Sequence, residues 1–262
     1  MNWTPVCYEY DGTFAGFLTC VFESYAQHEE PVCFLTAEDG RTTLWDTRRL
    51  ESDQALARRV WKGVSRNISP GAARLASRAF LTCLEEREVH IWQFLEYGFR
   101  RGSSVMADLG DSRVDVLRRA VQHLEEEAHK YTGFVRFSDQ GGVLVAEIEP
   151  KNRVLPLLRV HFTQRFNTEA FVIFDRTHRE GLLHQGGQWA ILPMEDFDPG
   201  PASSREVHYR RLWRRFFQTI AIECRANPRC QDTHLPKRYR DMMTEFQPDE
   251  GEALDPVQGL RP

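Results

Sequence analysis

Apolar positions follow a helical period over most of the first half of the sequence. A stripe from Phe14 to Tyr25 predicts one helix, and apolar residues that recur every three or four positions predict four more between about residues 50 and 131. Only residues 6–10, and a few residues after Pro31, alternate as short strands do. We therefore expect a helical N-terminal half.

The pattern changes to alternation beyond about residue 132. Strands are expected at residues 133–137, 143–148, 170–175, 182–184 and 188–192, with one helix at residues 155–166. Ser203 and Glu206 can form a capping box for a long helix that runs to Asn227-Pro228, and a short helix is expected from Pro236 to Phe246.

These elements predict an α+β fold. The helical N-terminal half would be followed by an antiparallel sheet of about four to five strands, with the long C-terminal helix packed on it. We expect a single domain over residues 1–246, with a helical part at about 50–131 and a sheet and helix part at about 132–246. The tail, residues 247–262, has no periodicity and is expected to be disordered.

Composition limits the class of protein. The chain has 262 residues, of which 41% are hydrophobic, enough to fill a core. No window is apolar enough for a membrane span, and the first residues do not have the pattern of a secretion signal. The six cysteines include no close CxxC pair, so free thiols are expected. We expect a cytoplasmic protein with no membrane partner.

Charge is unevenly distributed. The net charge is −4, but residues 205–240 contain ten Lys or Arg and three Asp or Glu, a local charge of +7. Arg210, Arg211, Arg214 and Arg215 would form a rigid stripe on the long helix, while Tyr209, Leu212, Phe216 and Ile220 would face the core. Guanidinium groups bind phosphate oxygens, so this stripe is a candidate DNA-binding site. A salt-bridged surface helix is an equal alternative.

The segment after this helix adds further candidates for nucleic-acid binding. They share a turn and the first residues of the next helix, and they are Arg225, Asn227, Gln231, Lys237, Arg238 and Tyr239. Such a turn can receive an anion, and Tyr239 could stack on an exposed base. The alternative is a helix stop and a packing corner.

Catalytic and metal sites have weaker support. A pocket of His129, Arg136, His161, Arg165 and Asp175 is conceivable and would suit proton transfer or phosphate binding. A histidine beside a helix is, however, more often structural. The spacing of Cys224, Cys230 and His234 is not a standard zinc pattern, so neither a metal nor a cofactor is expected.

Several blocks together resemble one family. They are YDGTFAGFLTCVFESY, HKYTGFVRF, IEPKNRVLPLLRVHFTQRF, FVIFD and LWRRFFQTIAIECRANPRCQDTHLPKRY. The chain resembles the DUF4130 family of domains of unknown function, whose members are described as DNA metabolism or DNA repair proteins. After Tyr239 the family commonly has a tryptophan, whereas this chain has Arg240.

The resemblance implies partners rather than a reaction. Members are associated with radical S-adenosylmethionine (radical SAM) proteins similar to photoproduct lyase, and some are fused to a uracil-DNA glycosylase-like domain. Three hypotheses remain. The chain is a DNA-binding accessory protein of DNA repair, a metal-independent enzyme acting on a nucleobase or phosphodiester, or an interaction module that does not bind DNA.

Overall fold

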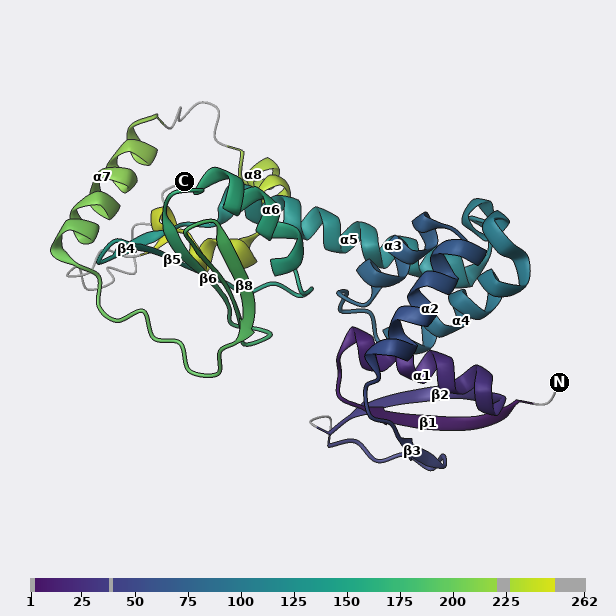
Figure 1. Ribbon diagram of the computed structural model, residues 1–262. Helices are drawn as coiled ribbons and strands as arrows, with labels where there is room; N and C mark the ends of the chain where they lie inside the picture. Colours follow the sequence, from purple (N-terminus) through teal and green to yellow (C-terminus); the bar gives the residue numbers. More distant parts are fainter. Residues whose placement is uncertain (1–2, 38–39, 221–226, 248–262) are drawn as a thin grey trace. The chain divides into compact units, whose positions relative to one another are not determined.

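The computed structural model describes residues 3–37, 40–220 and 227–247. The chain forms two compact units, Met1–Glu126 and Glu127–Pro262, and each is described by itself (Figure 1). The boundary between the units, after Glu126, lies about five residues before the point at residues 131–132 where the sequence changes from helical to alternating character. It lies inside the long helix α5 (Ser112–Phe134). The expected single domain over residues 1–246 stays a prediction.

Unit 1 begins with a small parallel sheet. Strands β1 (Thr4–Tyr10), β2 (Glu29–Thr36) and β3 (Thr47–Arg49) lie in the order β2-β1-β3, and β1 pairs in parallel with both neighbours. Helix α1 (Phe14–Gln27) makes the crossover that a parallel β1–β2 pair requires. The sequence predicts β1, α1 and a strand after Pro31. It does not predict β3, because Thr-Arg-Arg carries no apolar alternation.

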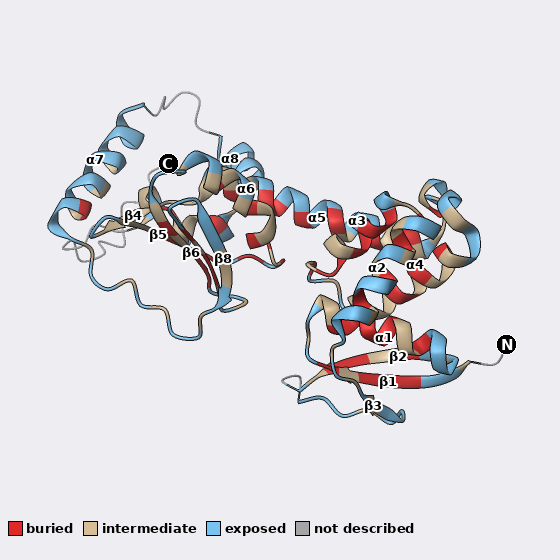
Figure 2. Ribbon diagram, in the orientation of Figure 1, coloured by how far each residue is buried: buried red, intermediate tan, exposed pale blue. Residues whose placement is uncertain are grey.

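Helices complete unit 1, as the periodicity predicts. They are α2 (Gln54–Asn67), α3 (Pro70–Ala79), α4 (Arg87–Arg101), the 3₁₀ helix η1 (Gly102–Ala107) and the first part of α5. Ser69 caps α3 through a hydrogen bond from the Ala72 amide, and Pro70 occupies the first turn. Tyr8, Phe17, Ile91 and Phe94 lie in the core that joins these helices to the sheet (Figure 2).

Unit 2 contains a mixed five-stranded sheet. Its order is β4 (Ser138–Gln140), β5 (Val143–Ile148), β6 (Ala170–Asp175), β7 (Glu180–Gln185) and β8 (Gln188–Pro193). Three of the four pairings are antiparallel, but β5 and β6 are parallel. The expectation of a wholly antiparallel sheet is therefore corrected. Helix α6 (Leu155–Arg165) has the length of a crossover helix and returns the chain to the same end of the sheet.

The first predicted strand of this half is also corrected. Residues 133–137 were expected to pair across the Gln-Gly-Gly turn, yet α5 continues to Phe134 and the pairing strand is β4, five residues further on. The turn itself is confirmed, because Gly141 and Gly142 have φ values of 65° and 95° that favour glycine.

The C-terminal part of unit 2 is helical. It contains α7 (Ser204–Ile220), α8 (Pro228–His234) and the 3₁₀ helices η3 (Lys237–Met242) and η4 (Thr244–Phe246). Helix α7 was expected to pack its apolar face on the sheet, but Tyr209, Leu212, Phe216 and Ile220 are each about half exposed (Figure 2). Residues 221–226, over which this helix was expected to continue, and the tail beyond Gln247 lie outside the described residues, and Asn227 and Pro228 begin α8.

Two expectations from composition can be compared with this structure. No helix in the described ranges is both long enough and apolar enough to cross a membrane. Among the described residues, Cys7, Cys20, Cys33, Cys83 and Cys230 are not in disulfide bonds, and Cys224 lies outside the described residues.

Candidate nucleic-acid interface

Polar contacts fix the first turns of α7 to the edge strand β4. The Ser203 hydroxyl accepts a hydrogen bond from the Glu206 amide at 3.1 Å, which confirms the Ser203 half of the predicted capping box. The Glu206 carboxylate accepts from the Asp139 amide at 3.1 Å and from Arg210 Nε at 2.9 Å. Arg210 also donates to Ser138 Oγ at 2.8 Å. The helix is thus attached by its polar side, which leaves its apolar side uncovered.

A second attachment joins the middle of α7 to η4. Glu245 accepts two hydrogen bonds from Arg136, at 2.7 and 3.2 Å, and one from Trp213 Nε1 at 3.1 Å. Burial raises the pKa of Glu245, but the hydrogen bonds from Arg136 and Trp213 outweigh it and hold the pKa below its ordinary value. Arg214 Nε donates to the Thr244 carbonyl at 3.0 Å. These bonds orient Arg136 and the Trp213 ring.

The predicted arginine stripe divides into two parts. Arg210 and Arg214 are engaged by the contacts above, so their charges serve the attachment of α7. Arg211 and Arg215 are exposed, and within the described ranges neither has a carboxylate partner. Residues at i and i+1 are about 100° apart around a helix, so one pair can face the fold while the other faces solvent. Of the four arginines in the stripe, Arg211 and Arg215 are therefore the two that are open to phosphate.

An open groove of about 820 Å³ lies along the apolar face of α7. Its aromatic lining includes Phe137, Phe166, Tyr209, Trp213 and Phe216. Arg136, Arg165 and Arg210 line it too. Arg165 is exposed and, among the residues that the structure describes, has no carboxylate partner. The groove thus combines aromatic faces with at least one available cation.

Tyr239 is not part of this surface. It is 2% exposed, and its ring packs against Tyr131 and Phe134 with centroid distances of 5.1 and 5.2 Å. Burial raises the pKa of its hydroxyl, which accepts a hydrogen bond from Arg238. The expectation that Tyr239 stacks on a base is corrected, because its side chain is buried.

The remaining residues after α7 are mostly structural. Asn227 caps α8 by accepting from the Cys230 amide at 3.1 Å. Arg238 donates to Glu127 at 2.8 Å, while Gln231 and Lys237 are exposed. Arg225 lies outside the described residues. Arg240, which departs from the family pattern, donates to Asp232 at 2.6 Å and to the Leu235 carbonyl at 3.0 Å.

The proposed catalytic pocket is not assembled as expected. Arg136 and Arg165 line one groove, but His129, His161 and Asp175 do not line it. His129 is exposed, and His161 places its ring edge-on to Phe162. Asp175 is fully buried and bonds within the β6–β7 turn. These five side chains therefore do not share one site.

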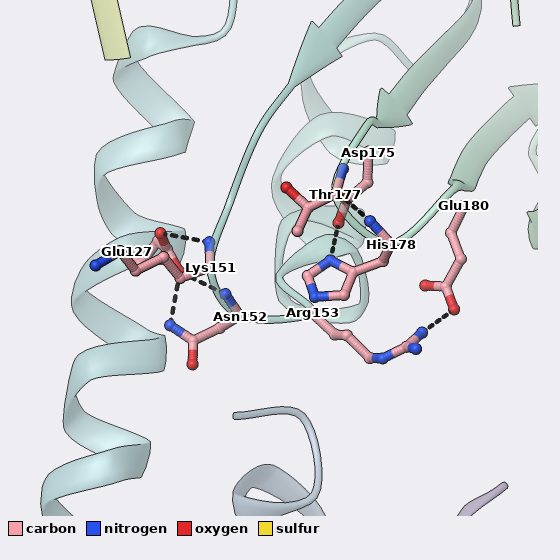
Figure 3. Close-up of polar contacts among 8 residues, drawn as sticks. All are labelled: Glu127, Lys151, Asn152, Arg153, Asp175, Thr177, His178 and Glu180. Carbon is pink, nitrogen blue, oxygen red and sulfur yellow. Dashed lines mark hydrogen bonds and ion pairs between the residues drawn. The ribbon is translucent and has the colours of Figure 1, made fainter. Parts of the chain in front are cut away.

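The sequence did not predict two clusters of polar side chains, which Figure 3 shows. In the first, Asp175 accepts from the amides of Thr177 and His178 at 3.0 Å each, and its other oxygen is 2.7 Å from His178 Nδ1. The sequence analysis placed Asp175 in a candidate catalytic pocket and did not link it to His178. Its carboxylate stabilises the hairpin turn and fixes the imidazole.

The second cluster surrounds Glu127, whose side chain is 3% exposed. Its carboxylate accepts from the amides of Lys151 and Asn152, from the Asn152 side chain and from Arg238. In the sequence Glu127 is the last of three consecutive glutamates, a pattern typical of a solvated helix face. It instead joins α5, the β5–α6 loop and η3.

No group of three His, Cys, Asp or Glu side chains placed to hold a metal occurs in the part of the chain that the structure describes, and Cys224 is outside it.

Comparison with known proteins gives one informative match. No curated protein matches the chain. The model of a domain of unknown function, DUF4130, matches residues 85–245. That range covers well over half of the sequence and contains α7, Glu245 and every residue named above as lining the groove. The chain therefore belongs to the DUF4130 family.

Proposed function

We propose that this protein binds DNA through unit 2, with α7 as the contact element. The observation that carries the proposal is the exposure of Arg211 and Arg215, beside the engaged Arg210 and Arg214 of the same stripe. An arginine that lacks a carboxylate partner offers its full charge to phosphate, whereas a paired one must first give up its partner. The rigid helix holds both guanidinium groups with little ordering cost.

The surface is smaller than the charge count of the sequence suggests. Of the ten basic residues between 205 and 240, Arg210, Arg238 and Arg240 are paired with Glu206, Glu127 and Asp232. We assign the phosphate contacts to Arg211 and Arg215, the exposed members of the stripe, and to the groove residue Arg165. Such contacts position a nucleic acid and do not read its sequence.

The biological setting proposed here comes from the family resemblance. The chain would act in the cytoplasm as an accessory protein of DNA repair, and would present DNA to a radical SAM protein similar to photoproduct lyase. A uracil-DNA glycosylase-like protein is a second proposed partner. A pull-down of the radical SAM protein, with and without nuclease treatment, distinguishes this role from that of a module that ignores DNA.

Fluorescence anisotropy with labelled single-stranded and duplex oligonucleotides at low salt tests DNA binding. Arg211→Glu/Arg215→Glu should weaken binding at least about tenfold, because each reversal replaces a phosphate contact by repulsion. The matched control is Arg58→Glu/Lys62→Glu, which reverses two exposed charges four residues apart on α2. The control should stay within about twofold of wild type. Absence of binding to every DNA form, or equal loss in both double variants, would refute the proposal.

A further inference from the structure

We infer that the groove along α7 takes unpaired nucleotides, with bases stacked on its aromatic rings and the sugar-phosphate chain held by Arg165. This inference rests on the proposed DNA binding and deepens it, since it assigns the strand form. It depends on the exposure of the aromatic rings, on the volume of the groove and on which of the groove arginines are paired with carboxylates.

The aromatic residues of α7 share one face and are open to solvent. Tyr209, Trp213 and Phe216 follow the spacing i, i+4 and i+7, and they are 52%, 41% and 53% exposed. The Trp213 and Phe216 rings have centroids 5.8 Å apart and planes inclined at 35°. Large aromatic side chains gathered on one exposed face favour a partner with apolar faces of its own. Nucleobases have such faces once they are unpaired and unstacked.

The groove has aromatic lining from outside α7 too. Phe137 and Phe166 pack edge to face with ring centroids 5.0 Å apart. Both line the same groove as Trp213 and Phe216. A base that enters can therefore meet aromatic rings of α7 and rings of other elements. The volume of about 820 Å³ falls in the range of sites that enclose small ligands, which suits a nucleotide and not a double helix.

Charge inside the groove is too sparse for a duplex. Arg136 is neutralised by Glu245, and Arg210 by Glu206, which itself lines the groove. Arg165 remains as the groove cation without a carboxylate partner among the described residues. Duplex DNA hides its base faces and presents mainly phosphates, so it would gain little from this surface. A single strand gains from the rings and needs only a few cations.

Anisotropy with four oligonucleotide forms tests the inference. They are a single strand, a regular duplex, a duplex with a central unpaired loop, and a single strand made of abasic sites. Wild-type protein should bind the single strand and the looped duplex at least about fivefold tighter than the other two, since a stacked base contributes about a fivefold or larger factor. Equal binding of all four forms, or of natural and abasic strands, would overturn the inference and leave the proposed DNA binding intact. No binding to any form would overturn both.

Substitutions locate the effect. Trp213→Ala should weaken single-strand binding about fivefold or more and leave regular duplex binding within about twofold, whereas Trp213→Phe keeps a ring and should restore most of the affinity. The matched control is Trp189→Ala, which removes a similarly exposed tryptophan of the same unit on β8. Phe216→Ala, at a site with no side-chain hydrogen bond, repeats the test if Trp213→Ala does not fold. Equal effects at positions 189 and 213, or equal losses for single strand and duplex, would contradict the assignment.

Discussion

Replacing Glu127 should destabilise unit 2 more than any surface change on α5. The carboxylate accepts four hydrogen bonds: from the Lys151 amide at 3.0 Å, the Asn152 amide at 2.9 Å, the Asn152 side chain at 2.6 Å and Arg238 at 2.8 Å. Figure 3 shows the first three of these bonds converging on Glu127. Glu127→Ala would remove the acceptor of these hydrogen bonds from two amides and one side-chain NH₂ group.

The magnitude follows from these partners. Removing one member of a buried charged cluster typically costs about 3–5 kcal/mol. Arg238 contributes only a small part, because its side chain is 40% exposed and water can replace the carboxylate. We therefore expect Glu127→Ala to lower the free energy of unfolding of unit 2 by about 3–4 kcal/mol. Glu127→Gln keeps one carbonyl oxygen and should cost about 1.5–3 kcal/mol.

Native-state hydrogen exchange is the suitable assay, because amides of unit 2 report on that unit alone. The matched control is Glu126→Gln, one residue earlier on the exposed side of α5, where the carboxylate accepts only from Gln122 at 2.9 Å. The control should change the stability by less than about 0.5 kcal/mol. If Glu127→Ala lowers the free energy of unfolding by no more than the control does, the Glu127 cluster does not hold η3 to α5 and the β5–α6 loop.

Two further predictions concern pH and thiol chemistry. The pKa of Glu245 is lower in the folded chain than in the unfolded one, so its contribution to stability is present above the unfolded value of about 4.3 and is lost as pH falls through the folded value. The protection of α7 amides, relative to exchange of the unfolded chain at the same pH, should therefore fall below about pH 4 in the wild type and much less in Glu245→Gln, and equal acid sensitivity in both would argue against the attachment. Burial raises the pKa of Cys7 and Cys20 to about 12, so alkylation at pH 8 should label the exposed Cys83 and Cys230 first. Mass spectrometry that finds all four labelled at one rate would contradict this burial.

Local patterns predicted most of the elements but not how they pair. The strands at residues 143–148 and 170–175 and the helix between them were recognisable from alternation and spacing. Their parallel pairing was not, because the same pattern also suits an antiparallel sheet with a helical excursion. Strand β3 could not be found because its three residues carry no apolar side chain.

For the candidate site, the sequence predicted which residues share a helix face but not which of them are buried or paired. The spacing of Tyr209, Leu212 and Phe216 defines one apolar face, but it cannot say whether that face is covered by the fold or left open for a partner. The sequence also predicted the arginine stripe but not its division into engaged and exposed pairs, because Arg210 and Arg214 are engaged through tertiary contacts to Ser138 and Thr244. Tyr239 appeared in a basic segment, and only the structure places it against Tyr131.

The salt dependence of DNA binding tests most directly whether α7 offers unpaired positive charge to phosphate. With contacts from Arg165, Arg211 and Arg215, the logarithm of the affinity should fall against the logarithm of salt concentration with a slope of about −2 to −3. In Arg211→Glu/Arg215→Glu the slope should be smaller in magnitude by about 2. Binding that does not respond to salt, or a slope that this double variant leaves unchanged, would contradict the account.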